Sequence, residues 1–281
     1  MSNPSGLWLF SPNAPKNSQL FSLGDGSDGA LNVPSGTTTI DGFKQYTSVN
    51  VDSGATLTCT AETGILIILV QGTVTISGSF NLAGKGYNGG TPTSGYQQRG
   101  GGLGSGGGTY GNTDVLPIYL GSGGYGGNGV GGSCPGAGGA GGGALLLVAK
   151  KITVVGTISA NGANGSGGGC TYPSGGGGGG SGGSIFLVSP EMTLGTNLVT
   201  ATGGSGGGGG GSGGYGGRGA GYGTASAGVS GVSGTAGGDG RIRLDYAANT
   251  GSANPSAHEH GGLRVGYLKQ LMVNAGLGQV R

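Results

Sequence analysis

The chain has 281 residues, of which 79 are glycine, against a usual share of about 7% in proteins. Charged residues make up 8% and the formal net charge is +2. The composition therefore excludes an ordinary globular domain and a disordered polyelectrolyte, and it gives no reason to expect nucleic acid or an anionic membrane as a partner.

Targeting signals are not found either. No apolar run approaches the roughly 20 residues of a membrane span, so we expect no membrane insertion. The first ten residues lack the basic start and long apolar stretch of a secretory signal. We expect synthesis in a cytoplasm without a cleaved leader.

The first segment, residues 1–36, is polar and carries one apolar cluster that contains Trp8 and Phe10. Two interpretations stay open. Trp8 caps the open end of the fold, or the cluster is an attachment surface, since an aromatic patch at a terminus is a usual docking anchor. Further along, Asp25 and Asp28 stand in a Gly-Ser context, where we expect them to form turns.

From Thr37 onward the hydrophobic pattern has period two, which is typical of short strands. The pattern breaks at Ser53-Gly54, where a tight turn is expected. The strands predicted here are 49–51, 55–59, 65–70, 73–76 and 79–82. Strands this short and evenly spaced, with hardly any helical pattern, indicate a parallel β-solenoid or a β-sandwich.

An internal repeat favours the solenoid. A first copy recurs 78 residues later, and a third copy follows 40 residues on. The matches are Val70, Ile76, Gly78, Phe80 and Gly84 with Val148, Val154, Gly156, Ile158 and Gly162, then Val148, Thr153, Val154 and Ile158 with Val188, Thr193, Leu194 and Leu198. A truncated fourth copy begins at Asp239. Equal strand pairs with unequal insertions predict stacked coils with excursions on one face.

Three glycine-rich excursions, residues 84–143, 161–183 and 203–240, follow the repeated strands. Ordering each residue costs about 1–2 kcal/mol, and glycine has no side chain to pack, so its backbone has to supply the contacts. Glycine in the polyproline-II helix has three residues per turn and outward-pointing N–H and C=O groups that can pair laterally. We expect a polyglycine-II slab, with plain disorder as the alternative.

The expected fold class is thus all-β, a short parallel β-solenoid with inserted glycine-rich excursions packed as polyglycine-II helices. The expected organisation has three parts. Residues 1–36 form a cap or attachment segment, residues 37–246 form the solenoid with its slab, and residues 247–281 form a docking tail.

Eight of the eleven tyrosines lie within the glycine excursions or at their turns. In one interpretation these rings seal the ends and faces of the slab. In the other they belong to binding loops on a rigid scaffold, where tyrosine supplies large contact area at low entropy cost. The receptor-binding candidates are Tyr96, Arg99, Tyr110, Tyr119, Tyr172, Tyr215 and Tyr222.

The C-terminal part changes character. Tyr267, Leu271 and Met272 have helix-like spacing and are attachment candidates, although this stretch can also simply pad the last coil. On an extended strand His258 and His260 would share a face and could ligate one metal ion, most simply in a threefold assembly. The alternative is a solvated tail without any cofactor.

Cysteines and catalytic groups are sparse. The three cysteines form no CxxC pair and predict neither a disulfide framework nor a zinc site, although a bridge between Cys134 and Cys170 is possible. Three glutamates and seven aspartates leave little for a paired-carboxylate glycosidase, and both histidines lie in one triplet, which leaves no distant base for a nucleophile. We expect no enzyme activity.

One resemblance is carried by four stretches, LIILVQGTVTISGSF, GGGALLLVAKKITVVGTISANGANG, GGSIFLV and GGDGRIRL. Separated by glycine-rich sequence, they resemble glycine-rich surface proteins of tailed bacteriophages. More loosely, they resemble the distal tail-fibre adhesins of T-even-type phages, in which a polyglycine sandwich carries receptor-binding loops. The resemblance covers about residues 25–246, and the solenoid half departs from the T-even adhesins.

The resemblance implies a virion protein assembled in the host cytoplasm. Its expected partners are other virion proteins of the tail fibre or capsid and a bacterial cell-surface sugar or outer-membrane protein. A receptor-binding adhesin is the leading expectation. A structural capsid decoration or fibre protein is the alternative, and an ice-binding protein is the third, because polyglycine bundles can present flat faces.

Overall fold

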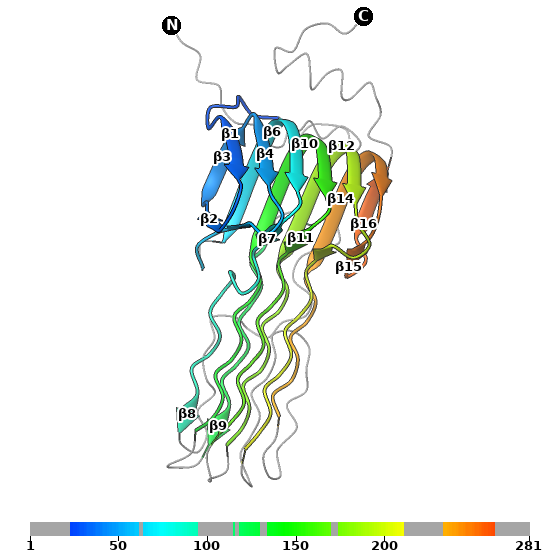
Figure 1. The fold of residues 1–281 in the computed structure, drawn as a ribbon. Helices are drawn as coiled ribbons and strands as arrows, with labels where there is room; N and C mark the ends of the chain where they lie inside the picture. Colours follow the sequence, from blue (N-terminus) through cyan, green and yellow to red (C-terminus); the bar gives the residue numbers. More distant parts are fainter. Residues whose placement is uncertain are drawn as a thin grey trace, which may run out of the picture.

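The computed structural model describes residues 23–61, 64–94, 115, 118–129, 134–169, 174–210 and 233–261. Within these residues the secondary structure is all-β and contains no helix. Two parallel sheets stack coil on coil, and long extended segments run side by side away from one end of the sheets (Figure 1). The predicted all-β class with parallel, solenoid-like sheets is confirmed.

The larger sheet, which we call sheet A, is parallel throughout. Its order is β1-β4-β6-β10-β12-β14-β16, and β3 pairs with the first half of β6. The strands are β1 (Ala30–Val33), β3 (Gly42–Tyr46), β4 (Ser48–Val51), β6 (Ile65–Ile76), β10 (Ala144–Val154), β12 (Ser184–Leu194), β14 (Arg241–Thr250) and β16 (His258–Gly261).

The smaller sheet, sheet B, is also parallel and has the order β15-β13-β11-β7-β5-β2. Its strands are β2 (Thr37–Thr39), β5 (Thr56–Thr58), β7 (Ser79–Asn81), β11 (Thr157–Ser159), β13 (Val199–Thr200) and β15 (Ala253–Asn254). Each follows a sheet A strand after a short turn, so one coil contributes one strand to each sheet. The turn predicted at Ser53-Gly54 is present, with φ of 82° at Gly54.

The main core lies between the two sheets. Leu145 and Leu147 of β10 point inward and pack in one cluster with Phe80 of β7 and Ile158 of β11, all at most 1% exposed. Burying such a side chain stabilises the fold by about 1.5–3 kcal/mol. Alternate residues of the strand therefore face the core, as the period-two pattern predicts.

Part of the outer face of sheet A is also buried, which the alternation did not predict. Leu146 and Val148 of β10 point away from the main core and pack in a second cluster with Leu23, Val115 and Phe186. Leu23 and Val115 lie outside the sheets, so chain flanking the solenoid covers this face. Strands buried on both faces read as continuous apolar runs, such as ALLLVA in β10.

The 40-residue match gives the register of β10 and β12 correctly, with Val148 paired to Val188. The 78-residue match is correct in the second half of β10 and one residue off in the first half. Val154 pairs with Ile76 and Thr153 with Thr193, as the spacings of 78 and 40 predict. Val148, however, pairs with Leu69 and not with Val70, because a bulge between Ala149 and Lys151 shifts the register.

Three other expectations are corrected. Ile158 pairs with Val199 and not with Leu198, so the turn after β12 is one residue longer than its counterpart. The strands predicted at 65–70 and 73–76 form one continuous strand, β6. The fourth copy is not truncated, because β14 pairs with β12 over nearly its whole length and is followed by β15 and β16.

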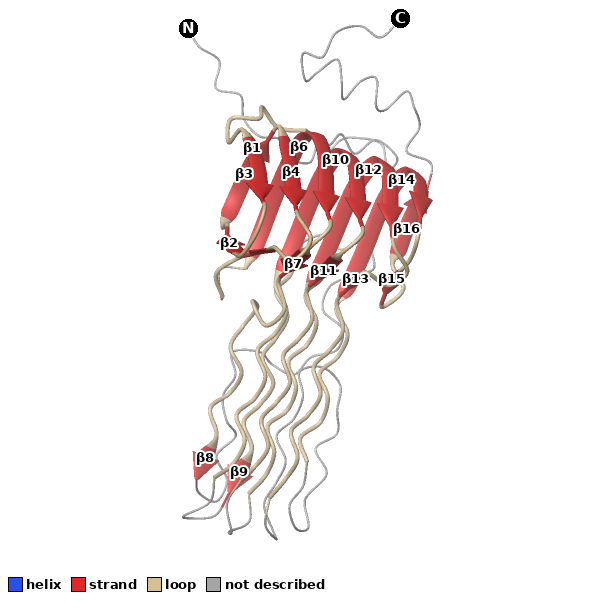
Figure 2. Cartoon of the chain, viewed as in Figure 1, coloured by secondary structure: helices blue, strands red, loops and turns tan. Residues whose placement is uncertain are grey.

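Among the described residues, the glycine slab contains seven extended segments, 84–92, 118–129, 134–143, 160–169, 174–183, 201–210 and 233–240 (Figure 2). In the first coils a short loop joins each sheet B strand to the next sheet A strand, as between β5 and β6. In the later coils the slab segments take the place of these loops. At the sheet end, the outgoing and returning segments of each excursion bond to each other, through Gly143 N–H to Leu82 O, Gly183 N–H to Ala160 O and Gly240 N–H to Ala201 O.

Segment 174–183 lies in the middle of the slab and bonds to its neighbours with a three-residue period. Its backbone N–H groups donate to carbonyl oxygens of three neighbouring segments over 2.8–3.0 Å. To segment 118–129, the donors Gly175, Gly178 and Ser181 bond to Asn128, Tyr125 and Ser122, and to segment 160–169, Gly177, Gly180 and Gly183 bond to Ser166, Ala163 and Ala160. To segment 233–240, Gly179 and Gly182 bond to Thr235 and Gly238. The falling acceptor numbers show that segments 118–129 and 160–169 run antiparallel to it, and the rising ones that 233–240 runs parallel.

Glycine is required where segments meet. A Cβ placed on Gly177, Gly180 or Gly183 would lie 1.8–2.1 Å from a carbonyl oxygen of segment 134–143, closer than real atoms approach. Asparagine side chains stand at positions where they bond to the backbone of the next segment. Asn161 Oδ1 accepts a hydrogen bond from Thr202 N–H, and Asn164 Oδ1 accepts one from Ser205 N–H, both at 2.8 Å.

Candidate functional site

Tyr119 is the one predicted receptor-binding residue within the described chain. Its side chain is 40% exposed, and its backbone N–H donates to Ser184 Oγ at 3.3 Å, so it lies beside the start of β12 at the sheet end of the slab. The other candidates lie outside the described residues, namely Tyr96, Arg99, Tyr110, Tyr172, Tyr215 and Tyr222. The attachment candidates Trp8, Phe10, Tyr267, Leu271 and Met272 lie outside them as well.

The end of the slab far from the sheets is built from a row of bonded chain segments, which we call the distal row. It begins with a short parallel pair, β8 (Thr93–Ser94) with β9 (Asn128–Gly129) (Figure 2). Gly129 then forms an antiparallel bridge with Ser174, and Ser174 forms another with Gly210. One continuous row therefore links four segments that are far apart in sequence.

Ser174 is the best-held member of the distal row. Its N–H donates to Gly210 O at 2.8 Å, Gly210 N–H returns a bond to Ser174 O at 2.9 Å, and Ser174 Oγ donates to Gly210 O at 3.1 Å. The residue is fully buried. These bonds fasten the distal end of segment 174–183 to segment 201–210.

Cys134 takes part in a disulfide bond. Its carbonyl oxygen accepts a hydrogen bond from Gly169 N–H at 3.0 Å, so segments 134–143 and 160–169 meet at this end of the slab. Cys59 is a free thiol buried in the core, and Cys170 lies outside the described residues. Burial raises the pKa of the Cys59 thiol to about 11, so it stays protonated at neutral pH.

Most of the predicted receptor-binding residues lie in stretches of sequence that adjoin the distal end of the slab. The described slab segments end at Ser94, Gly129, Gly169 and Gly210. The sequence beyond these residues, 95–114, 130–133, 170–173 and 211–232, holds the six candidates named above that are not described. These stretches carry tyrosine and few charges, namely Arg99, Asp114 and Arg218. Carbohydrates and protein loops are the ligands that such sequence suits.

The His258 and His260 pair lies on an extended strand, as predicted, because both belong to β16. Their register partners are Arg243 and Asp245 of β14. Among the described residues no group of three or more histidine, cysteine or acidic side chains could hold a metal ion. The metal site therefore stays a prediction that requires other chains or other residues.

A buried ion pair beside this strand was missed by the sequence analysis. Arg243 Nε and NH2 donate to Asp245 Oδ1 and Oδ2, both at 2.7 Å, and the guanidinium carbon lies 4.5 Å from the centre of the Phe186 ring. Both charged residues are 6% exposed. Their alternate spacing in RIRLD was the available signal, since residues i and i+2 of a strand share a face.

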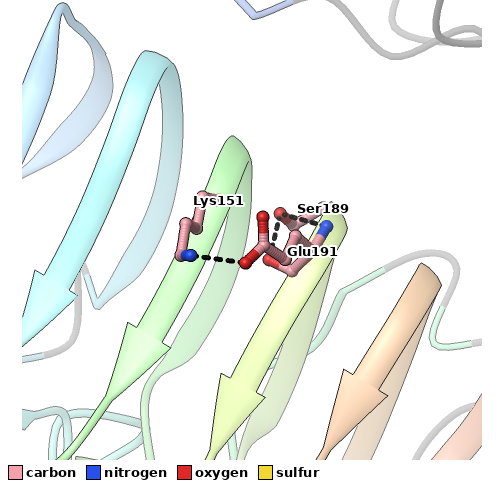
Figure 3. A network of polar contacts seen from close by, with 3 residues as sticks. All are labelled: Lys151, Ser189 and Glu191. Carbon is pink, nitrogen blue, oxygen red and sulfur yellow. Dashed lines mark hydrogen bonds and ion pairs between the residues drawn. The ribbon is translucent and has the colours of Figure 1, made fainter.

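A second ion pair is exposed. Lys151 of β10 and Glu191 of β12 are register partners, and their side chains pair across the strands (Figure 3). The Ser189 hydroxyl donates to Glu191 O at 2.9 Å and accepts from Glu191 N–H at 3.3 Å. The Ser189 hydroxyl thus bonds to backbone groups of the strand beside Pro190, which has no N–H to donate. We therefore assign these contacts to the structure of the sheet and not to a ligand site.

Comparisons with known proteins return no family. No family model, no curated protein and no solved structure matches this chain. Within the described residues, no helix is long and apolar enough to cross a membrane. The function has to be inferred from the slab and its distal row.

Proposed function

We propose that this chain is a virion surface protein of a tailed bacteriophage, and that it acts as a non-enzymatic receptor-binding adhesin. The distal row supports this proposal most directly. Four segment ends, at Ser94, Gly129, Ser174 and Gly210, lie in one row at the end of the slab far from the sheets. Backbone hydrogen bonds hold this row together. A rigid scaffold with loops at one end suits binding that has to tolerate changes in loop sequence.

The slab segments are polyglycine-II helices in this proposal. The three-residue period of the donors in segment 174–183 supports it, because the polyproline-II helix has three residues per turn. Backbone torsion angles from NMR or a crystal structure would test it. We expect φ of about −75° and ψ of about +145° at Gly177–Gly180, whereas values near the extended strand, with φ of about −120° or below, would contradict it.

The receptor is a bacterial cell-surface sugar or an outer-membrane protein. Candidate loop residues carry tyrosine and arginine, which are enriched among side chains that dominate binding energy. Other virion proteins, of the tail fibre or capsid, bind the molecule at the side opposite the distal row. No metal or other cofactor is needed for this activity.

Cell binding by the purified, labelled protein tests the adhesin. Bacteria are incubated with the unchanged protein and with the variants Tyr96→Ala, Tyr172→Ala and Tyr119→Ala, and bound label is measured against concentration. We expect the first two to weaken binding about tenfold or more, which corresponds to about 1.4 kcal/mol or more. Tyr119 was also a candidate from the sequence, but it lies at the sheet end and away from the distal row, so the proposal assigns it no role in binding. Tyr119→Ala is therefore the matched control.

Immunogold labelling of virions separates the adhesin from its alternatives. Label at the tail tip or fibre ends supports the adhesin. Label over the head, with no binding to cells, would favour a capsid decoration protein for which the stiffness of the slab suffices. Absence of label on particles would overturn the virion assignment, and an ice-binding role would then be examined by thermal hysteresis.

A further inference from the structure

We propose that a disulfide between Cys134 and Cys170 locks the distal end of the slab, and that it forms only after the chain leaves a reducing cytoplasm. The inference rests on the proposed function, because it assigns a regulation to the same binding end. Its starting observation is that Cys134 is disulfide-bonded, whereas Cys59 is a free thiol. The chain has one further cysteine, Cys170.

The hydrogen bonds around Cys134 bring the two cysteines within reach. Segments 134–143 and 160–169 run antiparallel, with Ala163 N–H bonded to Ala140 O and Ser166 N–H bonded to Ala137 O. Gly169 N–H bonded to Cys134 O continues the series by one step of three residues. Cys170 directly follows Gly169 in the sequence, and with Cys59 free it is the one cysteine of this chain left to pair with Cys134.

The position of the bond explains what it does. Cys134 and Gly169 form the last bonded pair between these two segments before the chain leaves the described slab. Terminal hydrogen bonds of an extended ladder are the first to open, because solvent can replace them. A covalent link next to that pair holds the ladder closed to its end.

The rest of the molecule makes this oxidation selective. Cys59 is fully buried between the sheets, and its raised pKa of about 11 leaves almost no thiolate at neutral pH. Thiol–disulfide exchange requires a thiolate with access to a disulfide, so Cys59 does not compete. Oxidation therefore yields one product and not a mixture of pairings.

The reaction converts two thiols into one disulfide with release of two protons and two electrons. Molecular oxygen or a low-molecular-weight disulfide such as oxidised glutathione accepts the electrons. Cytosolic thiol systems keep such pairs reduced, whereas an extracellular setting lets them persist. Chain assembled inside a host would thus keep both thiols, and the disulfide forms once the particle is released.

The first test is chemical and does not depend on receptor binding. Thiols of the purified full chain are counted under denaturing conditions before and after reduction, and the cross-linked peptide is identified by mass spectrometry. We expect one free thiol before reduction, three after it, and a peptide that joins Cys134 to Cys170. Three free thiols in air-oxidised protein, or a different pairing, would overturn the inference.

The second test compares the two redox states. Reduced protein, the Cys134→Ser variant and the Cys59→Ala control are assayed for protease cleavage at the distal end and for cell binding. Reduction and Cys134→Ser should each speed distal cleavage at least several-fold and weaken cell binding at least tenfold, with the circular dichroism of the sheets unchanged. The Cys59→Ala variant, which keeps the bridge, should respond to reduction as the unchanged chain does.

The outcomes separate the lock from the adhesin. Equal cell binding in both redox states would overturn the lock as a control of binding and leave the adhesin standing. No cell binding in either state would overturn the adhesin, and faster distal cleavage on reduction would then still support the lock. Equal cleavage rates in both states would overturn it.

Discussion

At the scale of single residues, the slab distinguishes glycines that face a neighbour from glycines that face solvent. Gly207 and Gly208 are adjacent, and both have ordinary φ values. A Cβ on Gly207 would lie 1.9 Å from Ser166 O, whereas a Cβ on Gly208 would meet nothing within 4 Å. Packing therefore requires glycine at position 207 and leaves room for a side chain at position 208.

We predict opposite effects for alanine at these two positions. Gly207→Ala should lower the free energy of unfolding by about 1–3 kcal/mol, because the segments have to move apart. Gly208→Ala should raise it by about 0.4–1 kcal/mol, because alanine reduces the entropy of the unfolded chain. Urea unfolding of the two variants measures both. Equal destabilisation would show that the close contact at Gly207 is not what requires glycine.

A second residue-scale prediction concerns pH. Asp41 accepts two hydrogen bonds from Thr60, from the hydroxyl at 2.7 Å and from the backbone N–H at 2.8 Å, and these bonds lower the pKa of its carboxyl below 3.8. The folded pKa lies below the unfolded one, so this stabilisation is fully present above about pH 4 and is lost as pH falls through the folded pKa.

NMR titration should place the Asp41 midpoint below 3.8. The Asp41→Asn variant should unfold more easily than the unchanged chain at pH 6, and the difference should shrink toward pH 2. A difference that stays constant over this range would show that ionisation of Asp41 is not involved.

At the scale of elements, the outer face of sheet A combines an apolar patch with a buried ion pair. Phe186 on β12 and Arg243 on β14 are register partners, and Asp245 lies two residues further along β14 on the same face. The guanidinium thus contacts the Phe186 ring and donates two hydrogen bonds to the Asp245 carboxylate. Buried pairs of this kind cost desolvation, so their value shows mainly when one member is removed.

We expect Asp245→Asn to lower the free energy of unfolding by about 3–5 kcal/mol, because it removes the charge that compensates the buried guanidinium. Replacing both members, as in Arg243→Met with Asp245→Leu, should cost less than the single change. Glu191→Gln is the control, since Glu191 and Lys151 are exposed at 55% and 42% and that pair should contribute about 1 kcal/mol or less. A larger cost for the double variant would contradict this account.

At the scale of the whole molecule, the solenoid sets the spacing and the slab continues it. Each returning segment leads into a sheet A strand, as segment 174–183 leads into β12 and 233–240 into β14. Neighbouring sheet strands lie about 4.8 Å apart, so the coils deliver the glycine segments already close to bonding distance. The slab thus needs no side-chain core of its own.

Hydrogen exchange should reveal this organisation. In edge segment 233–240, Gly234, Gly237 and Gly240 donate to segment 201–210, whereas Ala236 and Asp239 are exposed. We predict that the three bonded amides exchange at least tenfold more slowly than those of Ala236 and Asp239, which gives a three-residue period. Uniformly fast exchange across the segment, with the β14 amides still protected, would show that the slab is not held by these bonds.

The candidate site could be predicted only in part. Tyrosine placement pointed to the turns of the glycine excursions, and most of those residues lie outside the described chain. The distal row itself had no sequence signal, because Ser174 and Gly210 are a serine and a glycine among many. Partners so far apart in sequence are selected by the fold and not by local preference.

The sequence by itself determined the all-β class, the strand pairs and the places of the glycine excursions, because period-two burial and the absence of side chains are local properties. Only the tertiary structure decided the bulge beside Ala149, the burial of the Arg243–Asp245 pair and the order of segments in the slab. Glycine carries no side chain that could mark its neighbour. The neighbours are set instead by the stacking of the coils, which is a property of the whole molecule.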